Sequence, residues 1–303
     1  MNQLAYFIFD LLTMNVFNRK TMKTGKGKVI LAAAGPGDPE LVTVKTARYL
    51  QQADVVLTDR LVSEEILTEY VNADAEIVYV GKQCRRGIST PQETINELIV
   101  QHASEGKLVV RLKGGDVSVF SNILDELETV VSNNIPYEII PGVTAALGAA
   151  AYAGIPLTAR GYSTAVRLLT YYKSDIVTNK YWRELAETDD TLVFYMSSET
   201  LDQLVEKLVE NNIAEDKMLA VIEQATTPLQ NVHVTSLYDY EENLKGKSFV
   251  SPSLVIIGKV VALHEQFAWL KNSNSSEYYF KPVTNQYTKT EHSDKAILYA
   301  ARV

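Results

Sequence analysis

Three charged side chains that could do chemistry stand at the ends of runs predicted to be buried strands. Asp59 and Lys82 each follow such a run, and Asp116 follows a third run and two glycines, Gly114 and Gly115. Glycines let a ligand approach the main chain without meeting a side chain. Ligands of open α/β sheets bind beyond the carboxyl ends of the strands, so the pattern favours a binding crevice there. Asp116 could accept hydrogen bonds from a ribose, an amine or a cation; the alternative is a tight turn in which it caps a helix.

A cluster of cations lies near the second of these positions. Lys82, Arg85 and Arg86 fall within one short loop of a chain whose net charge is −8. The acidic balance argues against a general nucleic-acid binder, so an anionic ligand would need a local basic cluster of this kind. The loop is therefore either a solvated surface or the site of an anion.

Length and composition predict a globular protein of two domains. The chain has 303 residues, of which 46% are hydrophobic and 22% charged. The single cysteine, Cys84, excludes an internal disulfide and a multi-cysteine metal site, and the four histidines are widely spread, so no metal site is expected. A chain with so little cysteine suggests a reducing, cytoplasmic setting.

The apolar run from Leu4 to Phe17 resembles neither a secretory signal nor a membrane span. It contains Asp10, no basic residue precedes it, and at about fourteen residues it is too short to cross a bilayer as a helix. We expect residues 1–26 to form a disordered N-terminal extension, and we expect no membrane partner.

Strand and helix patterns alternate along most of the chain. Five strand–loop–helix units fill residues 28–153, which predicts a mainly parallel sheet with flanking helices. Strand patterns recur in the second half, which predicts a second α/β domain. The predicted boundaries are 1–26 for the N-terminal extension, 27–154 for the N-terminal α/β domain, 155–271 for the C-terminal α/β domain and 272–303 for a C-terminal extension outside the core.

The turn after the first predicted strand invites comparison with dinucleotide-binding proteins. It reads Gly35-Pro-Gly-Asp-Pro-Glu40, so Glu40 occupies the third glycine position of G-x-G-x-x-G. Its two prolines remove amide donors that would hold a pyrophosphate. An NAD-linked oxidoreductase is therefore an alternative with weak support.

Taken together and in order, the motifs resemble those of the tetrapyrrole methylase family. The resemblance implies two α/β domains with S-adenosyl-L-methionine in the cleft between them, and a homodimer. The matching stretches are GPGDPELVTVKTA (35–47), DVVLTDRLVS (54–63), VGK (80–82), TPQETIN (90–96), VVRLKGGD (109–116), PGVTAALGAAAYAGIPLT (141–158), TLVFYMS (191–197) and PSLVIIGKVVAL (252–263).

The resemblance also assigns roles to residues. Asp59 and Lys82 match the family's proposed acid/base pair, although each could instead serve as a charge partner. The positions that match cofactor contacts are Pro36, Gly114, Gly115, Asp116, Val119, Thr144, Ala145, Met196 and Ala225.

The implied reaction is two successive methyl transfers to uroporphyrinogen III, which gives precorrin-2 in sirohaem or cobalamin biosynthesis. The sulfonium of the methyl donor is already an activated electrophile, so the protein must mainly position the reactants and exclude water. The implied substrate carries eight carboxylates, for which guanidinium and ammonium groups are suitable partners. The candidate clamps are Arg85, Arg86, Lys113, Arg160 and Arg167.

Three departures from the family pattern fall on the substrate side. After Asp116 the family usually continues Pro-Phe-x-Phe-Gly-Arg-Gly-Gly-Glu-Glu, whereas residues 117–126 read VSVFSNILDE. Ala159 replaces a histidine, and Tyr171-Tyr172 replaces Gly-His. The methyl donor is therefore better supported than the acceptor. The alternatives are a related methylase acting on another tetrapyrrole or corrinoid, an NAD-linked oxidoreductase, and a non-catalytic tetrapyrrole-binding protein.

Overall fold

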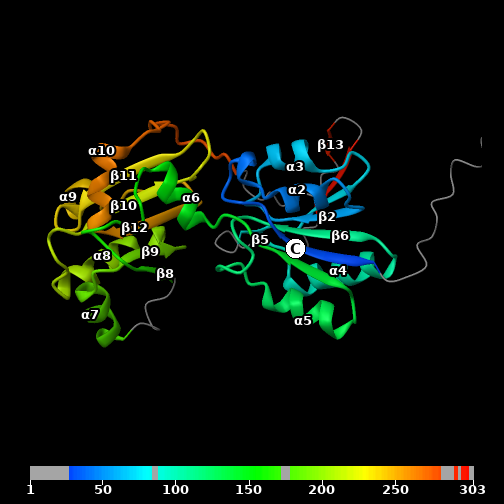
Figure 1. Cartoon of the computed structure of the whole chain (residues 1–303), viewed down its shortest axis with the longest axis horizontal. Helices are drawn as coiled ribbons and strands as arrows, with labels where there is room; N and C mark the ends of the chain where they lie inside the picture. Colours follow the sequence, from blue (N-terminus) through cyan, green and yellow to red (C-terminus); the bar gives the residue numbers. More distant parts are fainter. Residues whose placement is uncertain (1–26, 84–87, 172–177, 281–289, 293–294, 300–303) are drawn as a thin grey trace, which may run out of the picture.

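The computed structural model describes residues 27–83, 88–171, 178–280, 290–292 and 295–299 (Figure 1). The predicted N-terminal extension, residues 1–26, lies outside these ranges. Two larger sheets form the framework. The first has the strand order β13-β14-β3-β2-β6-β1-β7 and the second the order β11-β10-β12-β9-β8. The predicted fold class, α/β with a mainly parallel first sheet and a second α/β unit, is confirmed.

Five strands of the first sheet come from the N-terminal half of the chain, and these strands, β3, β2, β6, β1 and β7, are all parallel. The strands are β1 (Lys28–Ala33), β2 (Val55–Thr58), β3 (Glu76–Tyr79), β6 (Leu108–Lys113) and β7 (Tyr137–Ile140); the helices are η1 (Pro39–Leu41), α2 (Val44–Leu50), α3 (Glu64–Tyr70), α4 (Gln92–Ser104) and α5 (Leu124–Ser132). A small hairpin is formed by β4 (Lys82–Gln83) and β5 (Ile88–Ser89).

Both faces of the first sheet are covered, which explains the continuous apolar runs of its strands. On one face Ile30 and Val56 pack in one cluster with Leu50 of α2 and Ile66 of α3. On the other face the alternate residues of the same strands pack against α4 and α5. The helices after β1 and β2 thus lie on one face, and those that lead into and out of β6 lie on the other.

This change of face makes β1 and β6 a topological switch point. The two strands are neighbours in the sheet, but their following helices, α2 and α5, cover opposite faces. The carboxyl ends of strands at such a switch point are where open α/β sheets bind ligands. The glycines singled out in the sequence, Gly114 and Gly115, directly follow β6.

The second sheet is mixed, because β8 and β9 are parallel and the other pairings are antiparallel. Its elements are β8 (Val166–Thr170), α7 (Asn179–Glu187), β9 (Thr191–Tyr195), η4 (Ser198–Thr200), α8 (Leu201–Glu210), β10 (Met218–Glu223), β11 (Asn231–Ser236), α9 (Tyr240–Asn243), β12 (Ser253–Gly258), η5 (Lys259–Leu263) and α10 (His264–Phe267). One face packs against α7, α8 and α9.

The other face of the second sheet is covered by α6 (Ala145–Tyr152), which precedes the predicted domain boundary. Ala146, Ala149 and Ala150 of this helix share a core with Val193 and Ile222 of the second sheet. The expected boundary at residues 154–155 placed α6 in the first domain. Small side chains let α6 lie close to the second sheet, so the chain passes between the domains before α6, at residues 141–144.

The C-terminal residues also differ from the expectation of an extension outside the core. The strand β14 (Lys295–Tyr299) pairs in parallel with β3, and β13 (Thr290–His292) pairs with β14 at the edge of the first sheet. Within the described ranges, no helix combines the length and the apolar character needed to cross a membrane.

Candidate functional site

The two glycines after β6 have different roles. A Cβ on Gly114 would lie 2.5 Å from the main-chain oxygen of Leu61, so this glycine is required by the turn that follows β2. Gly115 has φ of +71°, and a Cβ there would meet nothing closer than the Ala145 nitrogen at 3.8 Å. Gly115 is also tied to Gly35 by a pair of main-chain hydrogen bonds of 2.7 and 3.1 Å. At the switch point Gly115 therefore leaves space where other residues have a side chain, while its own main-chain groups pair with Gly35.

Asp116 points into the protein and joins two loops. One carboxylate oxygen accepts hydrogen bonds from the nitrogen and hydroxyl of Ser118, at 2.8 and 2.5 Å, and the other accepts one from the Gly142 nitrogen at 2.8 Å. Burial raises the pKa of Asp116, but these hydrogen bonds outweigh it and the net shift is downward. The carboxylate expected to face a ligand thus fixes the loops after β6 and β7.

The second domain contacts these loops through β9. Tyr195 Oη accepts a hydrogen bond from the Ala146 nitrogen at 3.0 Å and shares one of 2.6 Å with Thr144 Oγ1. The ring of Phe120, from the loop after β6, lies 4.9 Å from that of Tyr195. Burial raises the pKa of Tyr195, so the phenol stays neutral. Met196 follows with 47% of its surface exposed.

The loop after β1 meets α6 and a turn of the second domain. A Cβ on Gly148 would lie 2.6 Å from the Pro36 ring, so the helix and the proline are in close contact. The Asp38 nitrogen donates a hydrogen bond to Thr226 Oγ1 at 3.2 Å, and the Asp38 carboxylate accepts one from Tyr152. These contacts hold the two domains together directly beside the switch point.

Three non-glycine residues on the second-domain side adopt left-handed backbone conformations. Met196, Gln224 and Thr226 have φ values of +55°, +46° and +66°. Such conformations are rare for residues with a Cβ and persist where surrounding contacts over-determine them, often at functional sites. Ala225, between two of them, is 8% exposed.

Most of the residues predicted to bind the cofactor are therefore close to one another. The contacts described above link Pro36, Gly115, Asp116, Thr144 and Ala145 through the loops after β1, β6 and β7. Val119 lies in the loop that carries Phe120 and is half-buried. These loops, together with Met196 and the turn around Ala225, form the candidate site at the β1/β6 switch point. It is called the β1/β6 crevice below, because open α/β sheets bind ligands at such a position.

Asp59 is held by a buried arginine. Its Oδ1 accepts a hydrogen bond of 2.6 Å from Arg111 Nη2, and its side chain remains 26% exposed while that of Arg111 is 2% exposed. Arg111 also donates to the main-chain oxygens of Leu57 and Leu112. Burial opposes the charge of Arg111, but Asp59 and Glu126 raise its pKa. Asp59 is thus an oriented carboxylate at the end of β2.

The predicted clamp Lys113 must be corrected, because it is buried. Its Nζ pairs with Glu126 Oε2 at 2.8 Å, and Glu126 Oε1 accepts a hydrogen bond from Arg111 Nε at 2.8 Å. Glu126 is 0% exposed. Burial, together with the charge of Arg111, lowers the pKa of Lys113. This ammonium neutralises an internal carboxylate and does not face a substrate.

The remaining predicted cations differ in their surroundings. Arg167 pairs with Asp190 at 2.5 Å and Glu184 at 2.6 Å, so its guanidinium already has two carboxylate partners. Arg160 is exposed, in a turn closed by a bridge between Ala159 and Ser163. Arg85 and Arg86 lie outside the described residues.

For Lys82 the structure describes the main chain only. It pairs with Ser89 in the β4–β5 hairpin. The preceding residue, Gly81, lies against the turn after β2, since a Cβ there would be 3.0 Å from the Arg60 nitrogen. The hairpin therefore begins beside Asp59.

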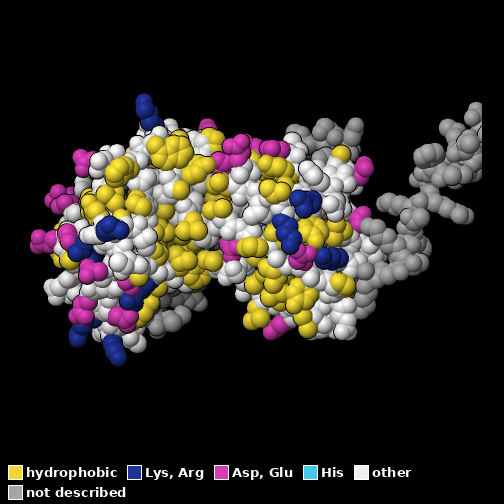
Figure 2. All heavy atoms as spheres, viewed as in Figure 1, with side chains coloured by type: hydrophobic (Ala, Val, Ile, Leu, Met, Phe, Trp, Pro, Cys, Tyr) yellow, Lys and Arg dark blue, Asp and Glu magenta, His cyan; other side chains and the backbone are white. Residues whose placement is uncertain are grey.

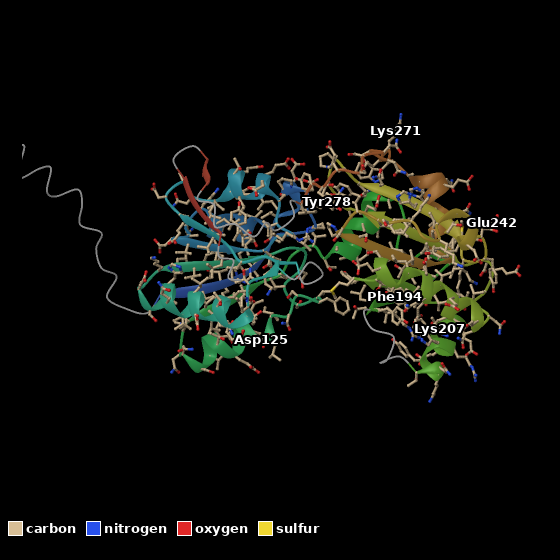
Figure 3. All side chains as sticks on the ribbon, turned by 180° about the vertical axis from the view of Figure 1, so that it is seen from behind. Asp125, Phe194, Lys207, Glu242, Lys271 and Tyr278 are labelled. Atoms are coloured by element: carbon tan, nitrogen blue, oxygen red, sulfur yellow. The ribbon has the colours of Figure 1, made fainter. Side chains whose placement is uncertain are left out.

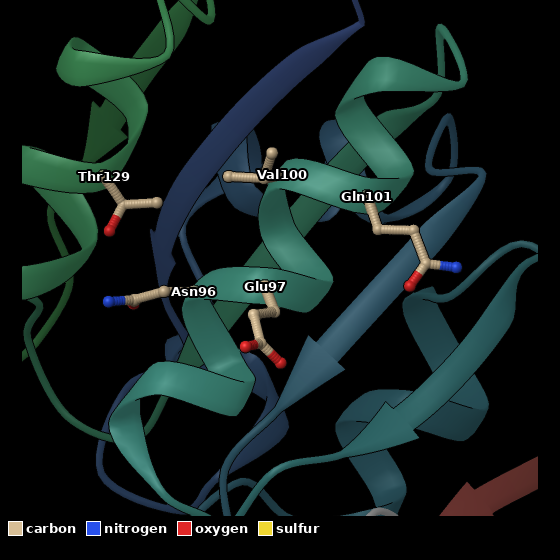
Figure 4. A pocket seen from close by; sticks show the side chains of 5 residues that line it. All are labelled: Asn96, Glu97, Val100, Gln101 and Thr129. Atoms are coloured by element: carbon tan, nitrogen blue, oxygen red, sulfur yellow. The ribbon is translucent and has the colours of Figure 1, made fainter.

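A separate shallow pocket lies on the outer surface of α4 and α5 (Figure 4). It is formed by helix side chains and not by strand ends, and it has a single carboxylate. It therefore lacks the features of the β1/β6 crevice. Its lining residues are Asn96, Glu97, Val100, Gln101 and Thr129. Among the described residues, no group of three or more His, Cys, Asp or Glu could hold a metal ion.

The sequence did not predict several residues that organise the crevice. The signal for Arg111 was a charge within an apolar strand, and the signal for Glu126 was a charge in the first turn of a helix. Tyr195 had only its place before Met196. Asp38 and Thr226 act through contacts between the domains, which leave no local pattern.

These observations define a two-domain α/β protein in which loops of both domains meet at the carboxyl ends of its parallel strands. The family profile of the Tetrapyrrole (Corrin/Porphyrin) Methylases matches residues 28–241. The chain belongs to this family.

Individual relatives extend the comparison. A siroheme synthase of Vesicomyosocius okutanii is 43% identical over 249 residues, which is 82% of this chain and 53% of the relative. The chain thus spans about half the length of the curated relatives it matches.

Two solved structures match this chain over nearly their whole length. A uroporphyrin-III C-methyl transferase of Thermus thermophilus, in complex with S-adenosyl homocysteine, is 34% identical with a TM-score of 0.65, covering 78% of this chain and 100% of its own. A cobalt precorrin-4 methyltransferase is 26% identical with a TM-score of 0.68, covering 77% of this chain and 95% of its own.

Proposed function

We propose that this chain is an S-adenosyl-L-methionine-dependent C-methyltransferase that converts uroporphyrinogen III to precorrin-2 by two successive methyl transfers. The observation that carries the proposal is the β1/β6 crevice, with the open main chain of Gly115 on one side and Met196 and Ala225 on the other. Its support is the family membership and the similarity to a uroporphyrin-III C-methyl transferase that binds S-adenosyl homocysteine.

The residues of the crevice fit a methyl donor of this kind. Gly115 lets a ligand approach the main chain without meeting a side chain, the neighbouring Ala145 nitrogen offers a hydrogen-bond donor, and Met196 offers an apolar surface. Asp116 contributes indirectly, because it fixes the loops that carry these groups. When bound, S-adenosylmethionine supplies an activated methyl group. The protein has to hold donor and acceptor at about 3–3.5 Å and in line.

Asp59 and Lys82 are the proposed proton-transfer or charge-partner groups for the acceptor. Methyl transfer to a fully substituted pyrrole carbon leaves a positive charge on the macrocycle, which is neutralised when a proton leaves from another position of the macrocycle. Asp59 is a half-buried carboxylate that Arg111 holds in one orientation, so it is placed to accept that proton or to balance the charge. The hairpin of Lys82 starts beside it. Arg160 remains a proposed partner for substrate carboxylates, as do Arg85 and Arg86, since an arginine can bind a carboxylate through two hydrogen bonds.

The test is anaerobic incubation with S-adenosylmethionine and enzymatically prepared uroporphyrinogen III, followed by mass spectrometry of the product. We expect a gain of two methyl groups. Binding of S-adenosylhomocysteine without a methylated product would retain the methyltransferase class and exclude this acceptor. Absence of both binding and product would exclude the proposed function.

A second acceptor is favoured by one specific observation. The segment 117–126 departs from the family pattern, and Phe120 and Asn122 in it have φ values of +52° and +54°. This loop reaches Tyr195 across the crevice, where it could change the shape of the acceptor site. A related methylase acting on another tetrapyrrole or corrinoid would give a methylated product with that acceptor alone.

We also propose that the protein is a homodimer. Figure 2 shows hydrophobic side chains gathered on the first domain over α5 and the edge strand β7. Exposed members of this surface are Leu124, Val131, Tyr137 and Ile139, with exposed fractions of 43–61%. A surface of this kind fits a partner better than water. Light scattering after gel filtration should give twice the mass of the chain, and a monomer would contradict the proposal.

The proposed location is the cytoplasm, with neither nucleic acid nor a membrane as a partner. The support is the single cysteine and the net charge of −8. Fractionation of cells that express the chain would test the location.

A further inference from the structure

A C-terminal strap, defined here as residues 269–280, runs from α10 of the second domain towards the first domain (Figure 1). Figure 3 shows Lys271 on the second domain and Tyr278 near the junction of the domains. At its start the Trp269 indole donates a 2.9 Å hydrogen bond to the main-chain oxygen of Ala151 in α6. The strap lies beyond the residues 28–241 that match the family profile.

Two asparagines attach the strap to β11, an edge strand of the second sheet. The side chain of Asn272 accepts a hydrogen bond from the Val232 nitrogen at 2.8 Å and donates one to the Val232 oxygen at 3.0 Å. Asn231 donates to the Ser275 oxygen at 3.0 Å and accepts from the Asn274 nitrogen at 2.8 Å. The Asn272 amide thus satisfies main-chain groups at the edge of the sheet, and the Asn231 amide satisfies main-chain groups of the strap.

Gln224 makes the third contact of this kind. Its Nε2 donates to the Glu277 oxygen at 2.9 Å, and its Oε1 accepts from the Tyr279 nitrogen at 2.7 Å. Gln224 is 0% exposed, so its amide depends on the strap for these hydrogen bonds. Its own nitrogen donates to the Pro252 oxygen at 2.7 Å, which fixes the start of the turn.

The strap also reaches the first domain. Tyr279 Oη donates a 2.5 Å hydrogen bond to Glu65 of α3, and the next residue, Phe280, is 2% exposed. The helix α3 starts five residues after Asp59. One segment therefore connects the turn that carries Ala225 with the corner that follows β2.

We propose that the C-terminal strap positions the turn Gln224–Thr226 for the methyl donor, with Gln224 as the positioning residue. This rests on the proposed function. The turn forms one side of the crevice, and its left-handed residues need external contacts to keep their conformation. The strap supplies two of these contacts through Gln224 and holds the same turn at a fixed distance from Asp59.

The experiment compares the full chain with two shortened chains and one point variant. A chain that ends at Lys271 lacks most of the strap, and a chain that ends at Phe280 keeps it, so the second is the matched control. Gln224→Met has nearly the same length and removes only the two hydrogen bonds. The measurements are the dissociation constant of S-adenosylhomocysteine by calorimetry, and KM for each substrate.

We expect the chain ending at Lys271 and Gln224→Met to bind S-adenosylhomocysteine about tenfold more weakly, because each loses at least two hydrogen bonds to the turn. KM for S-adenosylmethionine should rise by a similar factor while KM for the tetrapyrrole stays unchanged. The chain ending at Phe280 should match the full chain. A purely structural defect would lower the active fraction and leave both KM values unchanged.

A measurement made without ligand tests the role of the strap independently of the proposed function. Spin labels at Glu69→Cys in α3 and Glu206→Cys in α8, both exposed, report the distance between the domains in a Cys84→Ser background. Removal of the strap should broaden this distance distribution. Unchanged distances and unchanged affinity in the chain ending at Lys271 would overturn the proposal. Broadened distances in a protein whose full chain binds no S-adenosylhomocysteine would instead overturn the proposed function and, with it, the positioning role.

Discussion

The two sides of the crevice are built by different means. On the first domain, charged residues form ion pairs near the ends of parallel strands. Arg111 pairs with Asp59, and Glu126 pairs with both Arg111 and Lys113. On the second domain the groups are neutral, and they are held by the phenol of Tyr195 and by residues in left-handed conformations. The first side is an ion-pair network within one domain, whereas the second depends on contacts from other segments.

This difference separates orientation of the acceptor from placement of the donor. A buried ion network is rigid, because each charge is costly without its partner. It suits the side that carries Asp59. The neutral side can be adjusted by distant segments, since its hydrogen bonds come from α6 and from the strap. Substitutions on the two sides should therefore change different quantities.

The largest effect is expected from Glu126→Ala. The change leaves Arg111 and Lys113 buried without their shared carboxylate, and removal of one partner from such a site costs about 3–5 kcal/mol. Urea unfolding should show a decrease of that size in the free energy of unfolding. The exposed Glu128→Ala in the same helix is the control and should change it by less than about 0.5 kcal/mol. A small loss with Glu126→Ala would mean that the network is not the main support of this side.

Asp59→Asn should reduce turnover by about a hundredfold if the carboxylate transfers a proton. The amide oxygen can still accept the hydrogen bond from Arg111, so the fold and the affinity for S-adenosylhomocysteine should stay unchanged. Single-turnover methylation and calorimetry measure the two quantities. A matching loss of donor affinity would show that the two sides are not separate.

On the neutral side, Tyr195→Phe should act on the donor. The change removes the hydrogen-bond partner of Thr144 and of the Ala146 nitrogen, worth about 1 kcal/mol in total stability, and keeps the ring contact with Phe120. We expect the dissociation constant of S-adenosylhomocysteine to rise about fivefold by calorimetry. Tyr238→Phe, which removes a hydroxyl contact to Ile213 far from the crevice, is the control. Equal effects of the two variants would contradict a specific role for Tyr195.

The same contrast explains how much the sequence could predict. The parallel strands and the charged positions at their ends follow from local patterns, and both Asp59 and Asp116 were found in this way. The pattern could not show that Lys113 turns inward, because the site of Glu126 forms only when α5 packs on the sheet. It also could not place α6, whose small residues suit either sheet.

The second side and the strap were beyond local prediction for a different reason. Left-handed Met196 and Gln224 carry no glycine signal, because tertiary contacts impose their conformation. The strap has no period of two or 3.6 residues, since its contacts are made by single side-chain amides at irregular intervals.

The smallest effect is expected from pH, through Asp116. Its pKa is lowered in the folded protein, so its stabilising contribution is fully present above the pKa of an unfolded aspartate, about 3.9, and is lost as the pH falls through the lower folded value. Asp116→Asn lacks this titration. The free energies of unfolding of the wild type and of this variant should therefore differ by a constant amount from pH 7 to 5 and converge below about pH 4. Urea unfolding across this range measures the difference.

The control is Tyr195→Phe, on the neutral side, whose free energy of unfolding should differ from that of the wild type by the same amount at every pH. A difference for Asp116→Asn that stays constant down to pH 3 would mean that its carboxylate is not held by the charged hydrogen bonds to Ser118 and Gly142.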